Sequence, residues 1–146
     1  MHTSLLVSYR AANVMIDARL DWLGKLKRVG PGGIVLTHAH PDHARVLKRG
    51  APCPMYAPEK AWQELQQYLV KDRRVIKKRA PTKISGITFE AFSVEHSIPS
   101  PAVGYRVSAG RARIFYAPDL IFIHGRNAAV KGVHWRWHHG HALVYS

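Results

Sequence analysis

Alternating apolar and polar positions near the N-terminus predict two short strands. They cover residues 4–9 and 13–17, close enough along the chain to pair as a hairpin. Leucines between residues 20 and 26 then follow a short helical period, which the glycine- and proline-rich segment 30–33 ends. The apolar run over residues 33–36 is typical of a buried strand.

The next part of the chain changes between helical and extended patterns. A helical turn is predicted over residues 44–48 and a short strand over residues 54–56. Pro58 stands where the first turn of a helix tolerates proline. The apolar face of that helix is predicted to comprise Trp62, Leu65 and Leu69.

Strand patterns dominate from residue 84 onward. Strands are predicted over residues 87–94, 103–107 and 114–116, with turns between them. Strands, then helices, then further strands predict an α+β fold with a mixed sheet and helices on its outer face.

The C-terminal residues 124–146 depart from this pattern. They contain five of the ten histidines and two of the four tryptophans. Residues 133–146 show neither strand alternation nor a helical period. The segment is therefore predicted to be a tail that follows a domain over residues 1–123. It could bind metal, be disordered, or be a sequence that did not evolve with the fold.

The stretch from Thr37 to His43 carries the strongest chemical signal. It places four potential metal ligands in the pattern H-x-H-x-D-H directly after a predicted buried strand. His38 and His40 are two residues apart, so both imidazoles project to the same side of an extended segment. Pro41 favours an extended His40 and a turn, after which Asp42 and His43 would begin a helix. A polar loop with chance histidines is the alternative.

Further ligands are needed, because zinc usually takes four and a catalytic site keeps one position for water. His96 follows one predicted strand, and Asp119 follows another apolar strand. The alternatives are a surface or capping role for His96 and a turn aspartate after Pro118.

Composition restricts the class of protein. A length of 146 residues suits one domain with a real core. No apolar run approaches the roughly 18 residues needed to cross a bilayer, and no signal peptide is indicated. Cys53 is the only cysteine, which excludes an intramolecular disulfide and a cysteine-based zinc site. A soluble, cytoplasmic protein without membrane contact is expected.

The charge balance indicates an anionic partner. Twenty-two Lys and Arg against nine Asp and Glu give a net charge of +13, which favours polyanions, RNA or DNA first. The densest cluster supplies the candidate nucleic-acid-binding residues: Lys71, Arg73, Arg74, Lys77, Lys78 and Arg79. The alternative for this segment is a solvated connector between a helix and a strand.

These motifs together resemble the metallo-β-lactamase-fold metallohydrolases. The matching features are Asp17 after a strand, the H-x-H-x-D-H segment, a later lone histidine and an aspartate that closes a following strand. The resemblance extends over about residues 4–120 and implies an αββα sandwich with a metal centre at the sheet edge. His96-Ser97-Ile98-Pro99 is similar to a segment of J-type ribonucleases, and Gly104-Tyr105-Arg106 to a strand of ribonuclease Z-type enzymes.

The resemblance also implies roles for single residues. The ligands of a first metal would be His38, His40 and His96, and those of a second would be Asp42 and His43. Asp119 would bridge the two metals, and Asp17 would brace the motif loop from behind. Zinc suits this ligand set, as one or two ions, and manganese or iron occupies similar ligands.

One departure from the family stands at the C-terminus. The family supplies another histidine and a second αβ half from beyond the bridging aspartate, and few residues follow Asp119 here. The sandwich is therefore expected to be incomplete in its C-terminal half. It is expected to be truncated or altered, with the last ligand coming from the tail or from a second chain. A homo-dimer would cover an apolar sheet face left open by such a half.

The motif, the resemblance and the charge predict a metal-dependent hydrolase that uses a metal-bound hydroxide, aimed by Asp42 as catalytic residue. A phosphodiester or nucleic-acid substrate is favoured. Hydrolysis of a small ester, thioester or lactone is one alternative. A weakly active or inactive remnant that binds nucleic acid or metal is the other.

Overall fold

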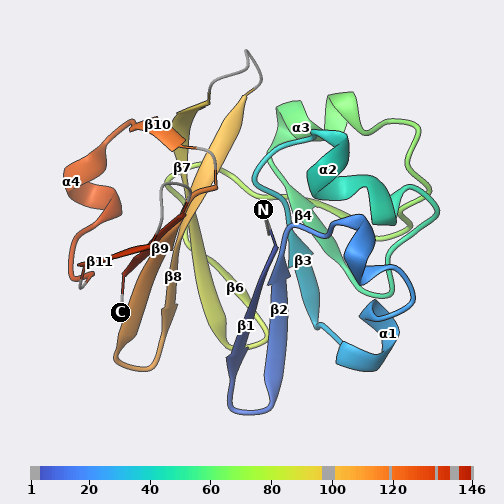
Figure 1. The fold of residues 1–146 in the computed structure, drawn as a ribbon, viewed down its shortest axis with the longest axis horizontal. Helices are drawn as coiled ribbons and strands as arrows, with labels where there is room; N and C mark the ends of the chain where they lie inside the picture. The colour runs from blue at the N-terminus through green and yellow to red at the C-terminus, as the bar shows by residue number, and fades with distance from the viewer. Residues whose placement is uncertain (1–3, 97–100, 119, 134, 139–141, 146) are drawn as a thin grey trace. The chain divides into compact units, whose positions relative to one another are not determined.

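The computed structural model describes residues 4–96, 101–118, 120–133, 135–138 and 142–145. The chain divides into two compact units, Met1–Ile76 and Lys77–Ser146, which are described in turn (Figure 1). Each unit contains its own sheet, and helices accompany both. The predicted α+β class is thus confirmed, with two five-stranded sheets in place of one mixed sheet.

Five strands form the sheet of the first unit. They are β1 (Leu5–Tyr9), β2 (Ala12–Ile16), β3 (Gly33–Val35), β4 (Met55–Ala57) and β5 (Arg73–Val75), in that spatial order. β1 and β2 pair antiparallel with Leu5 opposite Ile16, which confirms the predicted hairpin. From β2 to β5 the strands pair in parallel.

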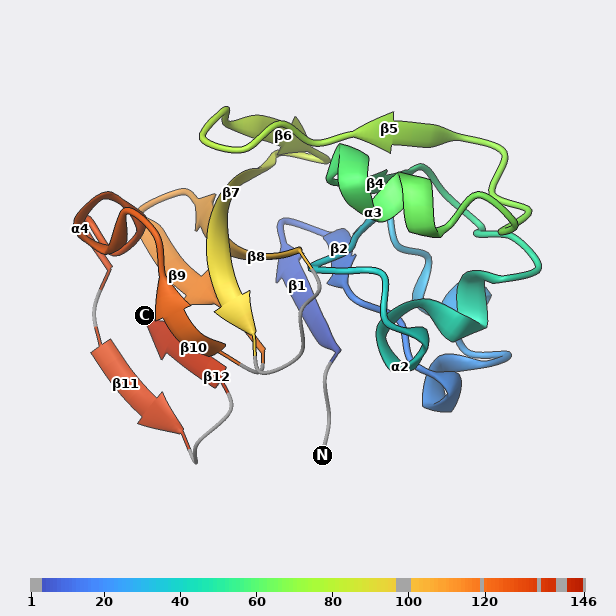
Figure 2. The same cartoon turned by 90° about the horizontal axis from the view of Figure 1, so that it is seen from above.

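Short helices cover one face of this sheet (Figures 1 and 2). They are η1 (Leu20–Trp22), α1 (Leu26–Val29), α2 (Pro41–Ala44), η2 (Arg45–Leu47) and α3 (Glu59–Glu64). Their apolar side chains share a core with the sheet, in which Met15, Ile34, Met55, Leu47 and Leu65 are almost fully buried. Each such side chain contributes about 1.5–3 kcal/mol on burial, so this core fixes the loops that join strands to helices.

The helix α3 is shorter than its predicted apolar face. It ends at Glu64; Trp62 and Leu65 are buried as predicted, whereas Leu69 is 70% exposed. The backbone N–H of Leu69 donates to the carbonyl oxygen of Lys48 at 3.0 Å, so the chain has already left the helix at that point. The placement of Leu69 on the helix face was wrong.

The parallel pairing of β2 and β3 brings the ends of both strands to one edge of the sheet. Asp17 follows β2 directly, and the segment from Thr37 to His43 begins just after β3. The backbone N–H of Asp17 donates to the carbonyl oxygen of Val35 at 2.9 Å. Two predicted site segments, distant in sequence, therefore meet at this edge.

The second unit contains an antiparallel sheet. Its strands are β6 (Thr82–Ile84), β7 (Ile87–His96), β8 (Ala102–Ala109), β9 (Ala112–Tyr116) and β10 (Leu120–Ile123). Their order is β10-β7-β8-β9, and β6 pairs with β7. The three strands predicted in this region are confirmed as β7, β8 and β9.

One face of this second sheet packs against α4 (Arg126–Ala129). Phe92 and Phe115 are fully buried there with ring centroids 6.1 Å apart, beside Ala129 and Val133. Edge-to-face ring contacts of this kind contribute beyond the area they bury. The helix has four residues, and the sequence pattern did not predict it.

Two further strands, β11 (Trp135–His138) and β12 (Ala142–Tyr145), pair antiparallel with Trp135 opposite Tyr145. Both strands lie within residues 133–146, whose sequence shows no strand alternation. Backbone hydrogen bonds make such a hairpin, so its strands form without a clean alternation of apolar and polar positions. The boundary predicted after residue 123 stays a prediction.

Among the described residues, no helix combines the length and the apolar character that a membrane crossing requires.

Candidate metal centre

The H-x-H-x-D-H segment leaves β3 and turns into α2 as predicted. The backbone N–H of Leu36 still donates to the carbonyl oxygen of Tyr56 at 2.9 Å, which keeps the chain on the sheet until the motif begins. His40 has an extended backbone (φ −56°, ψ 140°), the conformation favoured before a proline. Pro41 then occupies the first turn of α2, where its missing N–H has no helical partner to lose.

The three motif histidines are gathered together. The ring centroids of His38 and His40 lie 4.6 Å apart, and those of His38 and His43 lie 3.9 Å apart. His38 and His43 are each 1% exposed, which is unusual for polar rings. Strand end and helix start therefore bring the imidazoles to one place.

The carboxylate of Asp17 is hydrogen-bonded to two residues of the motif segment. One carboxylate oxygen accepts the backbone N–H of Thr37 at 2.8 Å, and the other accepts the Thr37 hydroxyl at 2.7 Å. That second oxygen also lies 2.9 Å from Nδ1 of His43. The Thr37 hydroxyl oxygen in turn lies 2.9 Å from Nδ1 of His38. A buried aspartate is thus linked to both buried histidines, directly and through one hydroxyl.

This network fixes where the ring protons lie. A carboxylate can only accept, so His43 carries its proton on Nδ1. The Thr37 hydroxyl gives its proton to Asp17, so its oxygen accepts from Nδ1 of His38. When the rings are neutral, the lone pair of each is then on Nε2, and both Nε2 atoms are buried. Histidine ligands of metals are commonly held by such a hydrogen bond on the opposite nitrogen.

Asp17 occupies this position under two constraints. Its φ of 58° lies in the left-handed region, which aspartate and asparagine tolerate better than other side chains. Its complete burial raises the pKa of the carboxyl group, and the hydrogen bonds from His43 and Thr37 oppose that increase.

Asp42 lies at the outer side of the group. Its side chain is 55% exposed, and its carboxylate is 3.4 Å from Nε2 of His43. An exposed carboxylate beside buried imidazoles can meet a molecule that approaches from solvent.

The donor set fits a divalent transition metal. Neutral imidazoles with their Nε2 lone pairs fixed, together with one carboxylate, suit zinc and also iron or manganese. In the part of the chain that the structure describes, no group of three or more His, Cys, Asp or Glu side chains is arranged to hold a metal ion. The network orients two of the predicted ligands but does not by itself complete a coordination shell.

The remaining predicted ligands do not belong to the first unit. His96 is the last residue of β7, in the second unit. Asp119 lies outside the described residues. Of the tail histidines, His124 lies with its Nε2 3.2 Å from a carboxylate oxygen of Glu95, and both side chains are more than half exposed. The metal roles of His96 and Asp119 stay predictions.

The basic segment is more structured than a connector. β5 (Arg73–Val75) forms an edge strand inside it. The Arg73 guanidinium donates to the carbonyl oxygens of Val70, Gln66 and Tyr68 and lies over the Trp62 ring. Arg74 makes two 3.0 Å hydrogen bonds to the Asp72 carboxylate, which raise the pKa of Arg74 and lower that of Asp72.

The other basic residues of this segment divide between the two units. Lys71 belongs to the first unit, and Lys77, Lys78 and Arg79 belong to the second. Arg79 lies over the Phe92 ring at 4.8 Å, whereas Lys71, Lys77 and Lys78 are exposed lysines. The lysines are therefore the better candidates for contact with phosphates.

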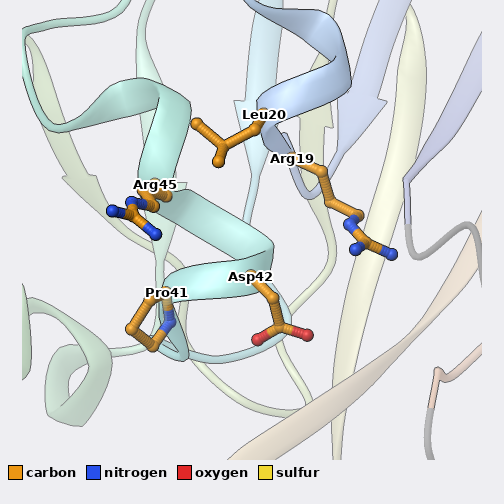
Figure 3. A pocket seen from close by; sticks show the side chains of 5 residues that line it. All are labelled: Arg19, Leu20, Pro41, Asp42 and Arg45. Atoms are coloured by element: carbon orange, nitrogen blue, oxygen red, sulfur yellow. The ribbon is translucent and has the colours of Figure 1, made fainter.

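Two features of the site were missed by sequence reasoning. Thr37 precedes the first motif histidine, and nothing in the pattern indicated that its hydroxyl links Asp17 to His38. The second is a pocket of about 300 Å³ beside α2, lined by Arg19, Leu20, Pro41, Asp42 and Arg45 (Figure 3). The only sequence signal for it is that Arg19 and Arg45 each stand two residues after a network member, Asp17 and His43.

The fold is similar to that of several solved structures. The metallo-β-lactamase fold protein YhfI from Bacillus subtilis matches with a TM-score of 0.62 and 16% identity, over 77% of this chain and 53% of that chain. An isothiocyanate hydrolase from Delia radicum gut bacteria matches with a TM-score of 0.65 and 15% identity, over 88% and 64%. A diphosphatase of the PhnP family matches with a TM-score of 0.55 and 29% identity, over 75% and 49%.

The chain thus spans between about half and two thirds of the length of these solved structures. No curated protein matches the sequence. The family described as "Beta-lactamase superfamily domain" matches residues 12–141, nearly the whole chain. With its two sheets and its H-x-H-x-D-H segment, this chain belongs to the beta-lactamase superfamily and has the metallo-β-lactamase fold.

Proposed function

We propose that this chain provides the metal-binding motif and the catalytic carboxylate of a divalent-metal-dependent hydrolase that cleaves phosphoester bonds. The observation that carries the proposal is the buried network of Asp17, Thr37, His38 and His43, which fixes the Nε2 lone pairs of both histidines. Holding each histidine through its Nδ1 leaves Nε2 as the nitrogen that could bind a metal, which is the arrangement common for histidine ligands.

The residues that would hold the metal are those of the motif. His38 and His40, with His96, would hold one ion, and Asp42 and His43 would hold another. A bound divalent ion supplies Lewis acidity and makes hydroxide available at neutral pH. Asp17 keeps the imidazoles in their ligating tautomer, and Asp42 accepts a hydrogen bond from the attacking water and aims it at the substrate.

Two observations support a phosphoester over other substrates. The diphosphatase match has 29% identity, whereas the isothiocyanate hydrolase match, at 15%, speaks only for the fold. The net charge of +13 favours anionic substrates over neutral esters, thioesters or lactones.

Metal content and turnover test the proposal together. The full chain is purified in the presence of zinc, dialysed, and analysed for metal per chain by mass spectrometry. Hydrolysis of bis-p-nitrophenyl phosphate is then compared with that of a thioester panel. At least one equivalent of metal is expected, with turnover of the phosphodiester above that of any thioester.

Two matched carboxylate variants complete the design. Asp42→Asn removes the charge at the motif, and Glu64→Gln makes the same change on the exposed end of α3. Turnover should fall by about 10²–10⁴-fold in Asp42→Asn, the usual contribution of a positioned acid or base, and should stay unchanged in Glu64→Gln. Less than one equivalent of metal with no turnover of any substrate would contradict the proposal. Turnover of thioesters alone would replace it with the small-ester alternative.

A further inference from the structure

The pocket beside α2 combines a small volume with an excess of positive charge. Its 300 Å³ lies at the lower limit for small-molecule sites and exceeds what a single phosphate group occupies. Two of its lining residues are arginines and one is an aspartate, so the charged side chains that line it have a net positive charge. Figure 3 shows the side chains of Arg19 and Arg45 on opposite sides of the view, with Leu20 and Asp42 between them.

The residues that line the pocket are close to the H-x-H-x-D-H segment or belong to it. Arg19 follows Ala18, whose backbone N–H donates to the carbonyl oxygen of His43 at 2.7 Å. Arg45 is the first residue of η2, directly after α2. Asp42 belongs both to the pocket and to the motif, where its carboxylate lies 3.4 Å from His43. A ligand in the pocket would therefore lie next to the proposed reaction centre.

Guanidinium groups point to a particular class of ligand. Their planar forks of N–H donors match the oxygen geometry of phosphate and bind it in bidentate fashion. Leu20 and Pro41 supply only apolar side chains, so the side-chain donors to an anion in this pocket are the two arginines. A neutral ester would offer these guanidinium groups no negative charge.

We propose that Arg19 and Arg45 form a binding pocket for a second phosphate group of the substrate, adjacent to the phosphate that is cleaved. This inference rests on the proposed function and narrows its substrate class to molecules with neighbouring phosphates. A nucleic-acid strand and a small diphosphate ester share that chemistry. A diester with one isolated phosphate lacks the group that the pocket binds.

Binding of inorganic phosphate tests the pocket without any turnover. Calorimetric titrations with the full chain are carried out in 150 mM salt with EDTA, so that no divalent ion at the motif holds the anion. The variants are Arg19→Gln, Arg45→Gln and, as a matched control, Lys60→Gln on the exposed side of α3. Each arginine variant should weaken phosphate binding by about tenfold or more, the usual effect of losing a charge-assisted hydrogen bond, and Lys60→Gln should leave it unchanged.

The position of Arg45 keeps this test independent of folding. Its side chain is exposed, so its replacement leaves the core intact. Equal phosphate affinity in the wild type and in Arg45→Gln overturns the proposal, as does the absence of measurable binding by the wild type.

Kinetics with paired substrates separate this proposal from the proposed function. A dinucleotide with a 5′-phosphate is compared with the same dinucleotide lacking it, and with two nucleosides joined through a diphosphate. The 5′-phosphate should lower KM several-fold in the wild type, and Arg19→Gln and Arg45→Gln should abolish that advantage. A preference for the joined diphosphate would identify the small ester as the source of the second phosphate.

Different experimental results would overturn the two proposals. Turnover of the dinucleotides with no advantage of the 5′-phosphate overturns the pocket and keeps the hydrolase. Arginine-dependent phosphate binding without turnover of any phosphoester keeps the pocket and removes the hydrolase.

Discussion

Thr37 joins the two arms of the hydrogen-bond network at the motif. Its hydroxyl donates to Asp17 at 2.7 Å and lies 2.9 Å from Nδ1 of His38, and the residue is 1% exposed. Without that hydroxyl, His38 loses the contact that sets its tautomer, although its ring stays in place. The proposed role of Thr37 is therefore to position His38 as a ligand.

Two substitutions of Thr37 separate this role from packing. Thr37→Val keeps the shape but removes the hydroxyl, so the free energy of unfolding should fall by about 1–3 kcal/mol, the cost of buried groups left unsatisfied. Zinc affinity should fall about 10–100-fold, as expected when a partner behind a metal ligand is lost. Chemical denaturation and competition with a chromophoric chelator measure the two effects. Thr37→Ser should retain most of the zinc affinity, and an equal loss in both variants would contradict the role of the hydroxyl.

Both the backbone angle and the side-chain contacts at position 17 restrict which residue type fits there. The left-handed φ of 58° would also suit glycine or asparagine. Glycine would remove all the acceptors, and asparagine would replace one of two acceptor oxygens by a donor. Only aspartate accepts from both groups of Thr37 and from His43 at this backbone position.

Cys53 provides a residue-scale test away from the motif. Burial raises the pKa of its thiol to about 11, and the charge of Asp72 adds to the increase. Since the thiolate is the reactive form and its pKa is raised, reaction with Ellman's reagent should still accelerate with pH above 10. In urea the same thiol should show the ordinary pKa near about 8.5. A rate that levels off near pH 9 in the folded protein would contradict the burial of this thiol.

At the scale of elements, periodicity predicted the strands best. The first hairpin and the strands β7, β8 and β9 have enough residues for alternation to appear, and the structure contains each of them. The missed elements include β10 and α4, which have four residues each. The end of α3 was missed for a different reason: Leu69 continues the helical spacing, but a backbone hydrogen bond to Lys48 draws the chain into a loop.

The site was predictable only in part, for a comparable reason. A motif gives residue types and spacing, so His38, His40, Asp42 and His43 could be named from the sequence. The contacts of the Thr37 hydroxyl with Asp17 and His38, and the presence of Arg19 and Arg45 beside one pocket, depend on how β2, β3 and α2 meet. Contacts between segments that are distant in sequence leave no local pattern.

The pairing of β8 with β9 depends on Gly104. A Cβ atom there would lie 2.7 Å from Cζ of Phe115 and 2.9 Å from Cβ of Ala117, both on buried residues. Gly104→Ala should therefore lower the free energy of unfolding by about 1–3 kcal/mol, the range for an overpacked core. Denaturant unfolding measures the loss.

A double variant identifies the cause of that loss. Phe115→Leu removes the ring atom that Gly104→Ala would meet, so the double variant should be more stable than the two single losses added together. Strict additivity would show that the clash with Phe115 is not what destabilises Gly104→Ala.

At the scale of the whole molecule, a net charge of +13 does not mean that every cation is available to a partner. Arg73 donates to three backbone carbonyl groups, and Arg74 is held by Asp72 and by the Tyr56 hydroxyl at 2.9 Å. Arg73 therefore stabilises the loop between α3 and β5, a role that its sequence context did not indicate. Lys77 and Lys78 are exposed in the second unit and are better placed for phosphates.

This difference leads to a prediction for binding to single-stranded RNA as a function of salt. If Lys77 and Lys78 each contact a phosphate, the double variant Lys77→Gln/Lys78→Gln should reduce the slope of log affinity against log salt by about 1.4, since each contact on a single strand contributes about 0.7. Fluorescence anisotropy between 50 and 200 mM salt gives the slope for both proteins. Arg73→Gln should instead lower the denaturation midpoint and change the slope little, because its guanidinium already binds the chain's own carbonyl oxygens. An unchanged slope in the lysine variant would exclude these two residues from phosphate contact.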